Sequence, residues 1–214
     1  MAELSENKIG ILGGTFNPIH LGHLILAQNA LETFDLDRVL LIPCAHPPHK
    51  NSSGLAAAEH RKAMADMAVE GDPSLEVSDI EIQRGGVSYT VDTLWQLSRV
   101  YPGAAFHFII GSDTLTELHL WKEVNKILEM CTVVTFARPG FDLRAVEPAS
   151  LELQPPWPER LLQNVSYGKQ IDISSSDIRY RVMEGMSIHY LVPAAVEMYI
   201  GEHGLYRERR GSGG

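Results

Sequence analysis

Short apolar runs alternate with helix-like segments along most of the chain. Compact apolar runs that end at glycine, proline or charged residues predict strands, and they lie at Lys8–Leu12, Arg38–Pro43, Leu75–Ile82, Phe106–Ile110, Thr132–Phe136 and near Gln170–Ile173. Apolar residues at helical spacing predict helices at Leu21–Thr33, Ala56–Glu70, Thr90–Val100, Ser112–Leu118, Trp121–Met130, Ser175–Glu184 and Pro193–Ile200. Strands that alternate with helices are typical of a parallel sheet. We therefore expect an α/β fold with a doubly wound, mostly parallel sheet flanked by helices, and ligands at the carboxyl ends of its strands.

The length of 214 residues suits one sizeable domain better than two. We expect this single domain over residues 1–207, with a C-terminal part at about 165–205, and a disordered tail at 208–214. Prolines and glycines punctuate the region 138–164, which predicts a long connection with little regular structure.

The charge balance narrows the function classes. The chain has 18 Lys+Arg and 27 Asp+Glu, a net charge of −9, which argues against a nucleic acid partner because such binding depends on an excess of basic residues.

Cys44 and Cys131 build neither a disulfide framework nor a CxxC metal site. The acidic start lacks the order of a secretory signal, and no apolar run approaches the roughly 20 residues of a membrane helix. We expect a cytoplasmic protein with no membrane partner, and leave open a homo-oligomer.

The turn after the first predicted strand, GGTFNPIHLGH at residues 13–23, has the parts of a phosphate cradle. It matches neither GxxxxGK[ST] nor GxGxxG. Gly13 and Gly14 nevertheless allow close approach of the backbone to a ligand, and Thr15 offers a hydroxyl. The helix that begins near Leu21 directs its free N–H groups and its positive dipole end to the same place.

Two histidines, His20 and His23, stand three residues apart at this helix start, so both imidazoles should face one side. Gly22 between them keeps the turn open. The pair could donate two N–H bonds to phosphate oxygens, and a bound polyphosphate would raise the pKa of both rings. For a lone histidine, a place in the core or on the surface would be the simpler interpretation, but the pair behind a Gly-Gly turn favours a phosphate site.

A second motif, ISSSDIR at residues 173–179, precedes the helix predicted at Ser175–Glu184. Ser174 and Asp177 form the pattern of a plain capping box, and we expect Asp177 to act only as a cap. Capping does not explain Arg179. An arginine in a helix whose start carries three hydroxyls predicts a second anion site, suited to the β- and γ-phosphates of ATP.

Both motifs resemble those of a known superfamily. GGTFNPIHLGH resembles the GxFxPxHxGH signature of the HxGH nucleotidyltransferases, and ISSSDIR resembles their ISSTxIR. The resemblance implies a Rossmann-like α/β fold and the transfer of an adenylyl or cytidylyl group. Two positions depart from the pattern: Asn17 stands where many relatives carry Asp, and Ser176 where Thr is commoner.

Further segments resemble the bacterial nicotinate-nucleotide adenylyltransferase branch, and the resemblance spans roughly residues 8–205. They share a place at the ends of predicted strands or the starts of helices: PPHK at 47–50, the Arg84–Thr90 segment (RxxxSYT), IIGSD at 109–113, Trp121, and RPG at 138–140. The shorter phosphopantetheine branch shares the first motif but should lack the SYT, Trp and RPG features.

The resemblance implies a role for each matching residue. The catalytic set would be Thr15, His20, His23 and Arg179. The ATP-binding set would be Gly13, Gly14, Thr15, Phe16, His20, His23, Gly111, Ser174, Ser175 and Arg179. The acceptor-binding set would be Lys50, Tyr89, Thr90, Asp113, Trp121 and Arg138.

Within these sets, the α-phosphate of ATP would contact Thr15 and His20, and the departing pyrophosphate His23 and Arg179. Lys50 would hold the acceptor phosphate and Asp113 a ribose hydroxyl. Thr90 and Trp121, on helices, would bind the carboxylate and ring of nicotinate mononucleotide. Direct in-line attack needs no protein nucleophile. Mg²⁺ would be bound mainly through the ATP phosphates, with no metal site of the protein's own.

Several simpler interpretations stay open. Trp95 and Trp121 could be core residues, and we expect Trp95 to point inward from its helix. Thr90 could cap its helix, and Lys50 could be a surface lysine. Zinc bound by His46 and His49 is disfavoured, because no cysteine pair, HExxH motif or inward carboxylate completes a tetrahedral set.

Three functional alternatives also remain. His20 could form a covalent adenylyl intermediate. The acceptor could be nicotinamide mononucleotide or another phosphorylated molecule. A regulator could bind nucleotide without catalysis, although it would not need His20, His23 and Arg179 together.

Overall fold

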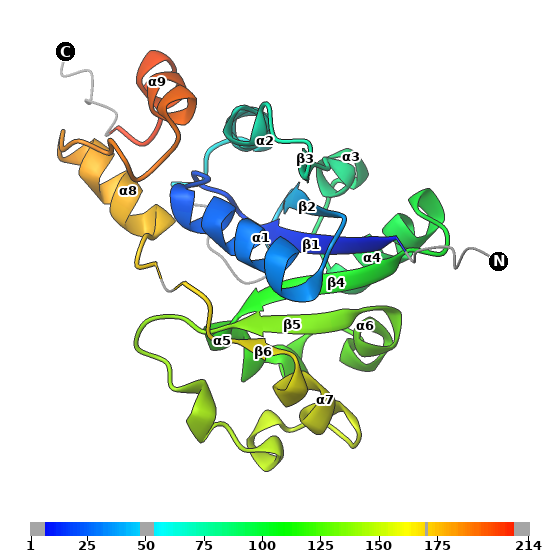
Figure 1. The fold of residues 1–214 in the computed structure, drawn as a ribbon. Helices are drawn as coiled ribbons and strands as arrows, with labels where there is room; N and C mark the ends of the chain where they lie inside the picture. The colour runs from blue at the N-terminus through cyan, green and yellow to red at the C-terminus, as the bar shows by residue number, and fades with distance from the viewer. Residues whose placement is uncertain (1–6, 48–53, 170, 208–214) are drawn as a thin grey trace.

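The computed structural model describes residues 7–47, 54–169 and 171–207. Within them a parallel sheet is formed by β1 (Lys8–Gly14), β2 (Arg38–Pro43), β3 (Leu75–Val77), β4 (Ala105–Gly111), β5 (Thr132–Phe136) and β6 (Val165–Ser166). The strand order is β3-β2-β1-β4-β5-β6, and every pair is parallel (Figure 1). This is the doubly wound, Rossmann-like arrangement that the sequence predicts.

Helices cover both faces of the sheet. They are α1 (Leu21–Phe34), α2 (Ala58–Val69), α3 (Ile80–Arg84), α4 (Thr90–Val100), α5 (Ser112–Leu115), α6 (Val124–Met130), α7 (Trp157–Gln163), α8 (Ser175–Met183) and α9 (Ala194–Glu202). Short 3₁₀ turns occur at Leu118–Leu120, Leu143–Ala145 and Pro148–Leu151. In the described residues, no helix is long and apolar enough to cross a membrane.

The core has two layers because successive strand residues point to opposite faces. In β2, Val39 and Leu41 join one buried cluster with residues of α1, α2, α8 and α9. Leu40 and Ile42 join the other cluster, with residues of α4, α5, α6 and α7. A strand that is buried on both sides reads as a continuous apolar run, which is why RVLLIP predicts this strand correctly.

Two strand predictions are corrected. The strand predicted at Leu75–Ile82 ends at Val77, where its pairing with β2 stops, and α3 follows from Ile80. No strand lies at residues 171–173; the edge strand is instead the short β6, which pairs with Thr135 and Phe136 of β5. Gln170 lies outside the described residues. A two-residue edge strand gives no periodic signal in the sequence.

The helix predictions around Trp121 and Trp95 also need correction. The predicted Ser112–Leu118 helix is the single turn α5 followed by a 3₁₀ turn, and α6 begins only at Val124 because Glu123 adopts a left-handed backbone with φ 55°. Trp121 is therefore not on a helix. Trp95 does not point inward: it is 54% exposed, and the Arg99 guanidinium lies 4.4 Å from the centre of its ring.

The long connection predicted over 138–164 contains two 3₁₀ turns and α7. The tail at 208–214 lies outside the described residues.

The strand order reverses between β1 and β4, and their carboxyl ends point to the side where α8 lies (Figure 1). In doubly wound sheets this switch point is where ligands bind. The N–H of Leu21 at the start of α1 donates to the Leu191 carbonyl at 2.9 Å, which joins the C-terminal segment to the first loop. The fold therefore brings the β1–α1 loop and the C-terminal segment together at the carboxyl ends of the strands.

Candidate active site

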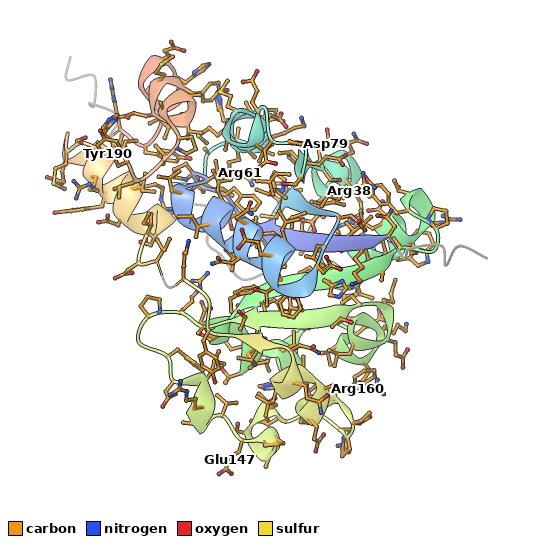
Figure 2. The ribbon with its side chains drawn as sticks, in the orientation of Figure 1. Arg38, Arg61, Asp79, Glu147, Arg160 and Tyr190 are labelled. Carbon is orange, nitrogen blue, oxygen red and sulfur yellow. The ribbon has the colours of Figure 1, made fainter. Side chains whose placement is uncertain are left out.

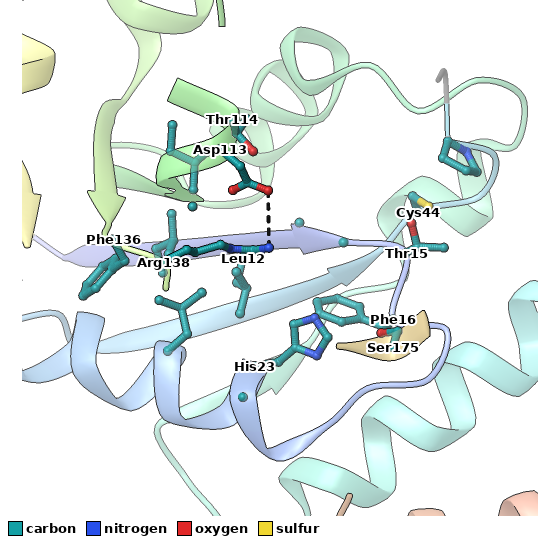
Figure 3. Close-up of a pocket in the computed structure, with 18 of the residues that line it drawn as sticks. Leu12, Thr15, Phe16, His23, Cys44, Asp113, Thr114, Phe136, Arg138 and Ser175 are labelled. Carbon is teal, nitrogen blue, oxygen red and sulfur yellow. Dashed lines mark ion pairs between the residues drawn. The ribbon is translucent and has the colours of Figure 1, made fainter. Parts of the chain in front are cut away.

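A cavity of about 1270 Å³ lies at the carboxyl ends of the strands. Its walls come from the β1–α1 loop, the ends of β2 and β4, the start of α4, the segment after β5 and the start of α8 (Figure 3). Almost all the residues singled out from the sequence line it: Gly13, Gly14, Thr15, Phe16, His20, His23, Tyr89, Thr90, Gly111, Asp113, Trp121, Arg138, Ser174, Ser175 and Arg179. Lys50 and His49 lie outside the described residues.

The β1–α1 loop is held in an unusual shape by Phe16. This buried residue has φ 46°, a left-handed backbone that a phenylalanine adopts rarely. The edge of its ring packs on His23, with 4.9 Å between ring centres. A Cβ on Gly14 would lie 3.0 Å from the Phe16 ring, so a larger residue there would displace the ring. Phe16 thus supports His23.

The two histidines lie against each other. Their rings stack with centres 3.6 Å apart and an angle of 27° between planes. The backbone N–H of His20 donates to Nδ1 of His23 at 3.2 Å. A Cβ on Gly22 would lie 3.0 Å from Nδ1 of His20, so this glycine leaves room for the His20 ring. Because Nδ1 of His23 accepts a hydrogen bond, its neutral ring carries the proton on Nε2 and offers that N–H as a donor.

His20 is neutral in the protein without nucleotide. Burial, and secondly the positive charge of Arg138, lower its pKa to about 4. Its Nδ1 is buried against the first turn of α1. A polyphosphate would oppose the charge of Arg138 and raise this pKa.

The second motif meets the first directly. Ser174 caps α8, and its Oγ accepts the N–H of Asp177 at 3.1 Å. Ser175 Oγ donates to the Pro18 carbonyl at 2.8 Å, and Arg179 Nη1 donates to the Asn17 carbonyl at 2.8 Å. Asp177 is exposed. The HxGH and ISSSDIR segments, 150 residues apart, therefore form one wall.

Asn17 is 6% exposed, and its side chain holds the β1–α1 loop in place through hydrogen bonds. Its Nδ2 donates to the Gly54 carbonyl at 3.0 Å, and its Oδ1 accepts from the Ala56 N–H at 3.0 Å and the Tyr206 hydroxyl at 2.9 Å. A carboxylate could not donate to Gly54, so the amide suits this particular network. The Asn17 amide, which departs from the superfamily pattern, thus makes three hydrogen bonds in this structure.

A second part of the cavity wall is formed by the start of α4 and by Trp121. Thr90 is the first residue of α4, and Tyr89 occupies the cap position without a side-chain cap bond, so the alternative that Thr90 caps the helix is wrong. The Lys122 ammonium lies 4.4 Å from the centre of the Tyr89 ring. Trp121 packs its ring at a right angle to Phe108, 5.7 Å between centres, so it is partly in the core and partly in the cavity wall.

Asp113 and Arg138 form an ion pair in the cavity wall, with Oδ2 and Nη1 3.3 Å apart (Figure 3). The sequence did not predict this pairing. The buried Ser112 Oγ accepts the Arg138 N–H at 3.0 Å and fixes the backbone there. A Cβ on Gly111 would lie 2.5 Å from Arg138 Nε and from Asp113 Oδ1. Glycine at 111 is therefore required by the pair as it stands.

The sequence interpretation missed Arg61. Its guanidinium lies beneath the β1–α1 loop, fully buried, and donates to three backbone carbonyls. One signal could have revealed it: Arg61 lies three residues before Met64, on the apolar face of the predicted helix. A cation on a buried helix face needs a partner of its own.

The described residues contain no group of three His, Cys, Asp or Glu side chains close enough to hold a metal ion. The wall around His20, Ser174 and Arg179 offers N–H and hydroxyl donors, which suit phosphate oxygens and not a cation.

A six-stranded parallel sheet with a double-histidine loop at its switch point and an arginine from a distant helix completing the wall defines an α/β nucleotidyltransferase. Residues 11–181 match the cytidylyltransferase-like family model. The chain is 44% identical over 202 residues to a protein of Desulfitobacterium hafniense named "probable nicotinate-nucleotide adenylyltransferase", covering 94% of this chain and 96% of the other. It is likewise 44% identical to a protein of the same name from Thermus thermophilus, covering 94% and 100%. The chain belongs to the nicotinate-nucleotide adenylyltransferase family.

The fold also agrees with a solved structure whose sequence is less similar to this chain than those relatives are. The nicotinic acid mononucleotide adenylyltransferase of Plasmodium falciparum, complexed with NaAD, superposes with a TM-score of 0.75 at 20% identity, covering 94% of this chain and 98% of the other. At this identity the likeness concerns the fold alone.

Proposed function

We propose that this protein transfers the adenylyl group of ATP to nicotinate mononucleotide, giving deamido-NAD and pyrophosphate. The observation that carries the proposal is the convergence of the two motifs: Arg179 and Ser175 bond to the carbonyls of Asn17 and Pro18, beside the stacked histidines. Family membership and the acceptor-side segments favour nicotinate mononucleotide as the acceptor.

In the proposed reaction an oxygen of the acceptor phosphate attacks the α-phosphorus of ATP in line. The bond between the α-phosphorus and the bridging oxygen breaks, and pyrophosphate leaves with its electron pair. No protein nucleophile is needed, so the protein acts by positioning and by neutralising charge.

The phosphate side supplies donors to both ends of this path. Thr15 and the buried His20 are assigned to the α-phosphate. His23 Nε2–H, Arg179, Ser174 and Ser175 are assigned to the departing pyrophosphate. Gly13, Gly14 and Gly111 leave room for the nucleotide, and Phe16 acts through His23.

The acceptor side is assigned to the mononucleotide. The start of α4 at Tyr89 and Thr90 presents free backbone N–H groups, which suit the pyridine carboxylate. Trp121 offers a ring face or edge to the pyridine, and Asp113 a carboxylate to a ribose hydroxyl. Arg138 would leave its ion pair with Asp113 and bind a phosphate of the substrate instead. Lys50 stays assigned to the acceptor phosphate from the sequence alone.

Mg²⁺ supplies charge neutralisation on the phosphates when it arrives with ATP. A cytoplasmic location and the absence of nucleic acid or membrane partners remain predictions, as does the state of any homo-oligomer.

A pyrophosphate-release assay with a panel of mononucleotides tests the function. Nicotinate mononucleotide should give the highest kcat/KM. Higher turnover with nicotinamide mononucleotide would reassign the acceptor, and tight ATP binding without pyrophosphate release would leave a regulator. An ATP chiral at an α-phosphorothioate separates the mechanisms: direct attack inverts the configuration, and a covalent adenylyl-His20 would retain it.

A further inference from the structure

Arg61 on α2 is a buried cation without a carboxylate partner. It is 1% exposed, and none of the carboxylates in the described part of the chain forms an ion pair with it. Buried arginines are normally paired, because an isolated charge loses its hydration. Figure 2 shows Arg61 on the side of α2 that faces the sheet. Its place requires another explanation.

The guanidinium donates to three backbone carbonyls, and its Nη1 also donates to Cys44 Sγ at 3.9 Å. Nη1 donates to the Thr15 carbonyl at 2.8 Å, Nη2 to the Ala45 carbonyl at 3.0 Å, and Nε to the Ala56 carbonyl at 3.0 Å. These three carbonyls belong to three separate segments of the chain. Only the rigid fork of a guanidinium reaches three acceptors in one plane; a lysine ammonium is a point charge on a flexible stem.

The three segments lie next to the parts of the cavity wall that are assigned to the two substrates. Thr15 belongs to the β1–α1 loop, which is assigned to ATP. Ala45 follows β2, and its N–H donates to Ser88 Oγ at 3.0 Å, directly before Tyr89 and Thr90 of the acceptor side. Ala56 is also held by Asn17, at 3.0 Å. Arg61 is thus the junction between the loop assigned to ATP and the loop assigned to the acceptor.

We propose that Arg61 is a positioning residue that sets the distance and direction between ATP and the acceptor. This inference rests on the proposed adenylyl transfer. In-line attack requires the two reacting atoms to lie about 3 Å apart and aligned, and a displacement of about 1 Å lowers the rate about 100-fold. Arg61 touches no reacting atom in this role. Loss of the fork lets the two loops shift relative to each other while each still binds its own substrate.

The proposal is tested with R61K, which keeps the positive charge and removes the fork. The single-turnover rate of pyrophosphate release should fall about 100-fold. The Kd of α,β-methylene ATP, a non-transferable analogue, should stay at the wild-type value. R38K is the control: Arg38 is the first residue of β2 and contacts Glu76 and the Tyr101 ring, away from the cavity, so the rate of R38K should not change.

Three results would overturn the proposal. An unchanged rate per folded molecule with a lower Tm would make Arg61 only structural. A Kd weakened by the same factor as the rate would make it an ATP-binding charge. An unchanged rate in S88A, the variant to use if R61K does not fold, would show that the link through Ala45 transmits nothing. Wild-type turnover on the mononucleotide panel is measured alongside. If the proposed adenylyl transfer is wrong, the wild-type protein itself will not release pyrophosphate. If only the positioning role is wrong, the wild-type protein will turn over and the ratio of variant to wild-type rate will stay near one.

Discussion

The two sides of the cavity are built differently. On the phosphate side, His20, Asn17 and Arg61 are buried, and hydrogen bonds from α8 and Tyr206 brace the loop. On the acceptor side, Asp113 and Arg138 are both more than half exposed and hold mainly each other. Donors that stabilise a transition state must be fixed before the reaction, because reorganisation would cost free energy. We therefore expect the phosphate side to be rigid and the acceptor side to be adjustable, so that the acceptor side would set substrate choice.

The largest effect should follow from removing a phosphate-side donor. H23A should lower kcat about 1000-fold, because a fixed donor is lost where charge develops on the leaving group. Single-turnover pyrophosphate release measures it, and circular dichroism checks the fold. H189A, which loses contacts to Glu197 on α9 and to the Tyr190 ring, is the control and should keep its rate. Near-normal turnover in H23A would contradict a rigid, essential phosphate side.

Acid should weaken the phosphate side through His20. Its pKa is about 4 in the folded protein and near 6.5 in an unfolded chain, so the unfolded chain takes up the proton first. The free energy of unfolding should therefore fall between pH 6.5 and 4, by up to about 3 kcal/mol. Urea unfolding at several pH values measures this, and H20Q should flatten the slope in that window.

Nuclear magnetic resonance provides a second readout of His20. With an ATP analogue bound, its pKa should rise above 4, because phosphate charge favours the imidazolium. A pKa that does not move would place the phosphates away from this ring.

Breaking the bond between the two motifs should have an intermediate effect. R179K should lower kcat/KM for ATP about 50-fold, because lysine cannot both reach the Asn17 carbonyl and offer a planar fork to pyrophosphate. R181K, two residues along the same helix and bonded to the Ser187 carbonyl, is the control. If both variants behaved alike, the convergence of the motifs would carry no function.

The acceptor side should give the smallest effect and a selective one. W121A should raise KM for the mononucleotide about 5-fold, since a ring contact of this kind is worth about 1 kcal/mol, while KM for ATP stays unchanged. W95A removes an exposed tryptophan from α4 and should change neither constant. Equal changes in both KM values would erase the distinction between the sides.

The sequence by itself determined the elements whose signal is local. Apolar runs such as RVLLIP and FHFII mark strands that are buried on both faces, and the helix starts follow from glycine turns. Most of the residues that the family resemblance selected also line the cavity. Local patterns failed where the signal is weak: the two-residue strand β6, the left-handed Glu123 before α6, and the exposed Trp95.

Tertiary structure alone decided how these parts are held. The bond of Arg179 to Asn17, the three carbonyls around Arg61 and the pairing of Asp113 with Arg138 join residues that are distant in sequence. Periodicity records which face of a helix is apolar, but not which distant carbonyl a buried cation will meet. The low pKa of His20 has the same origin, because burial and a neighbouring charge exist only after the chain has folded.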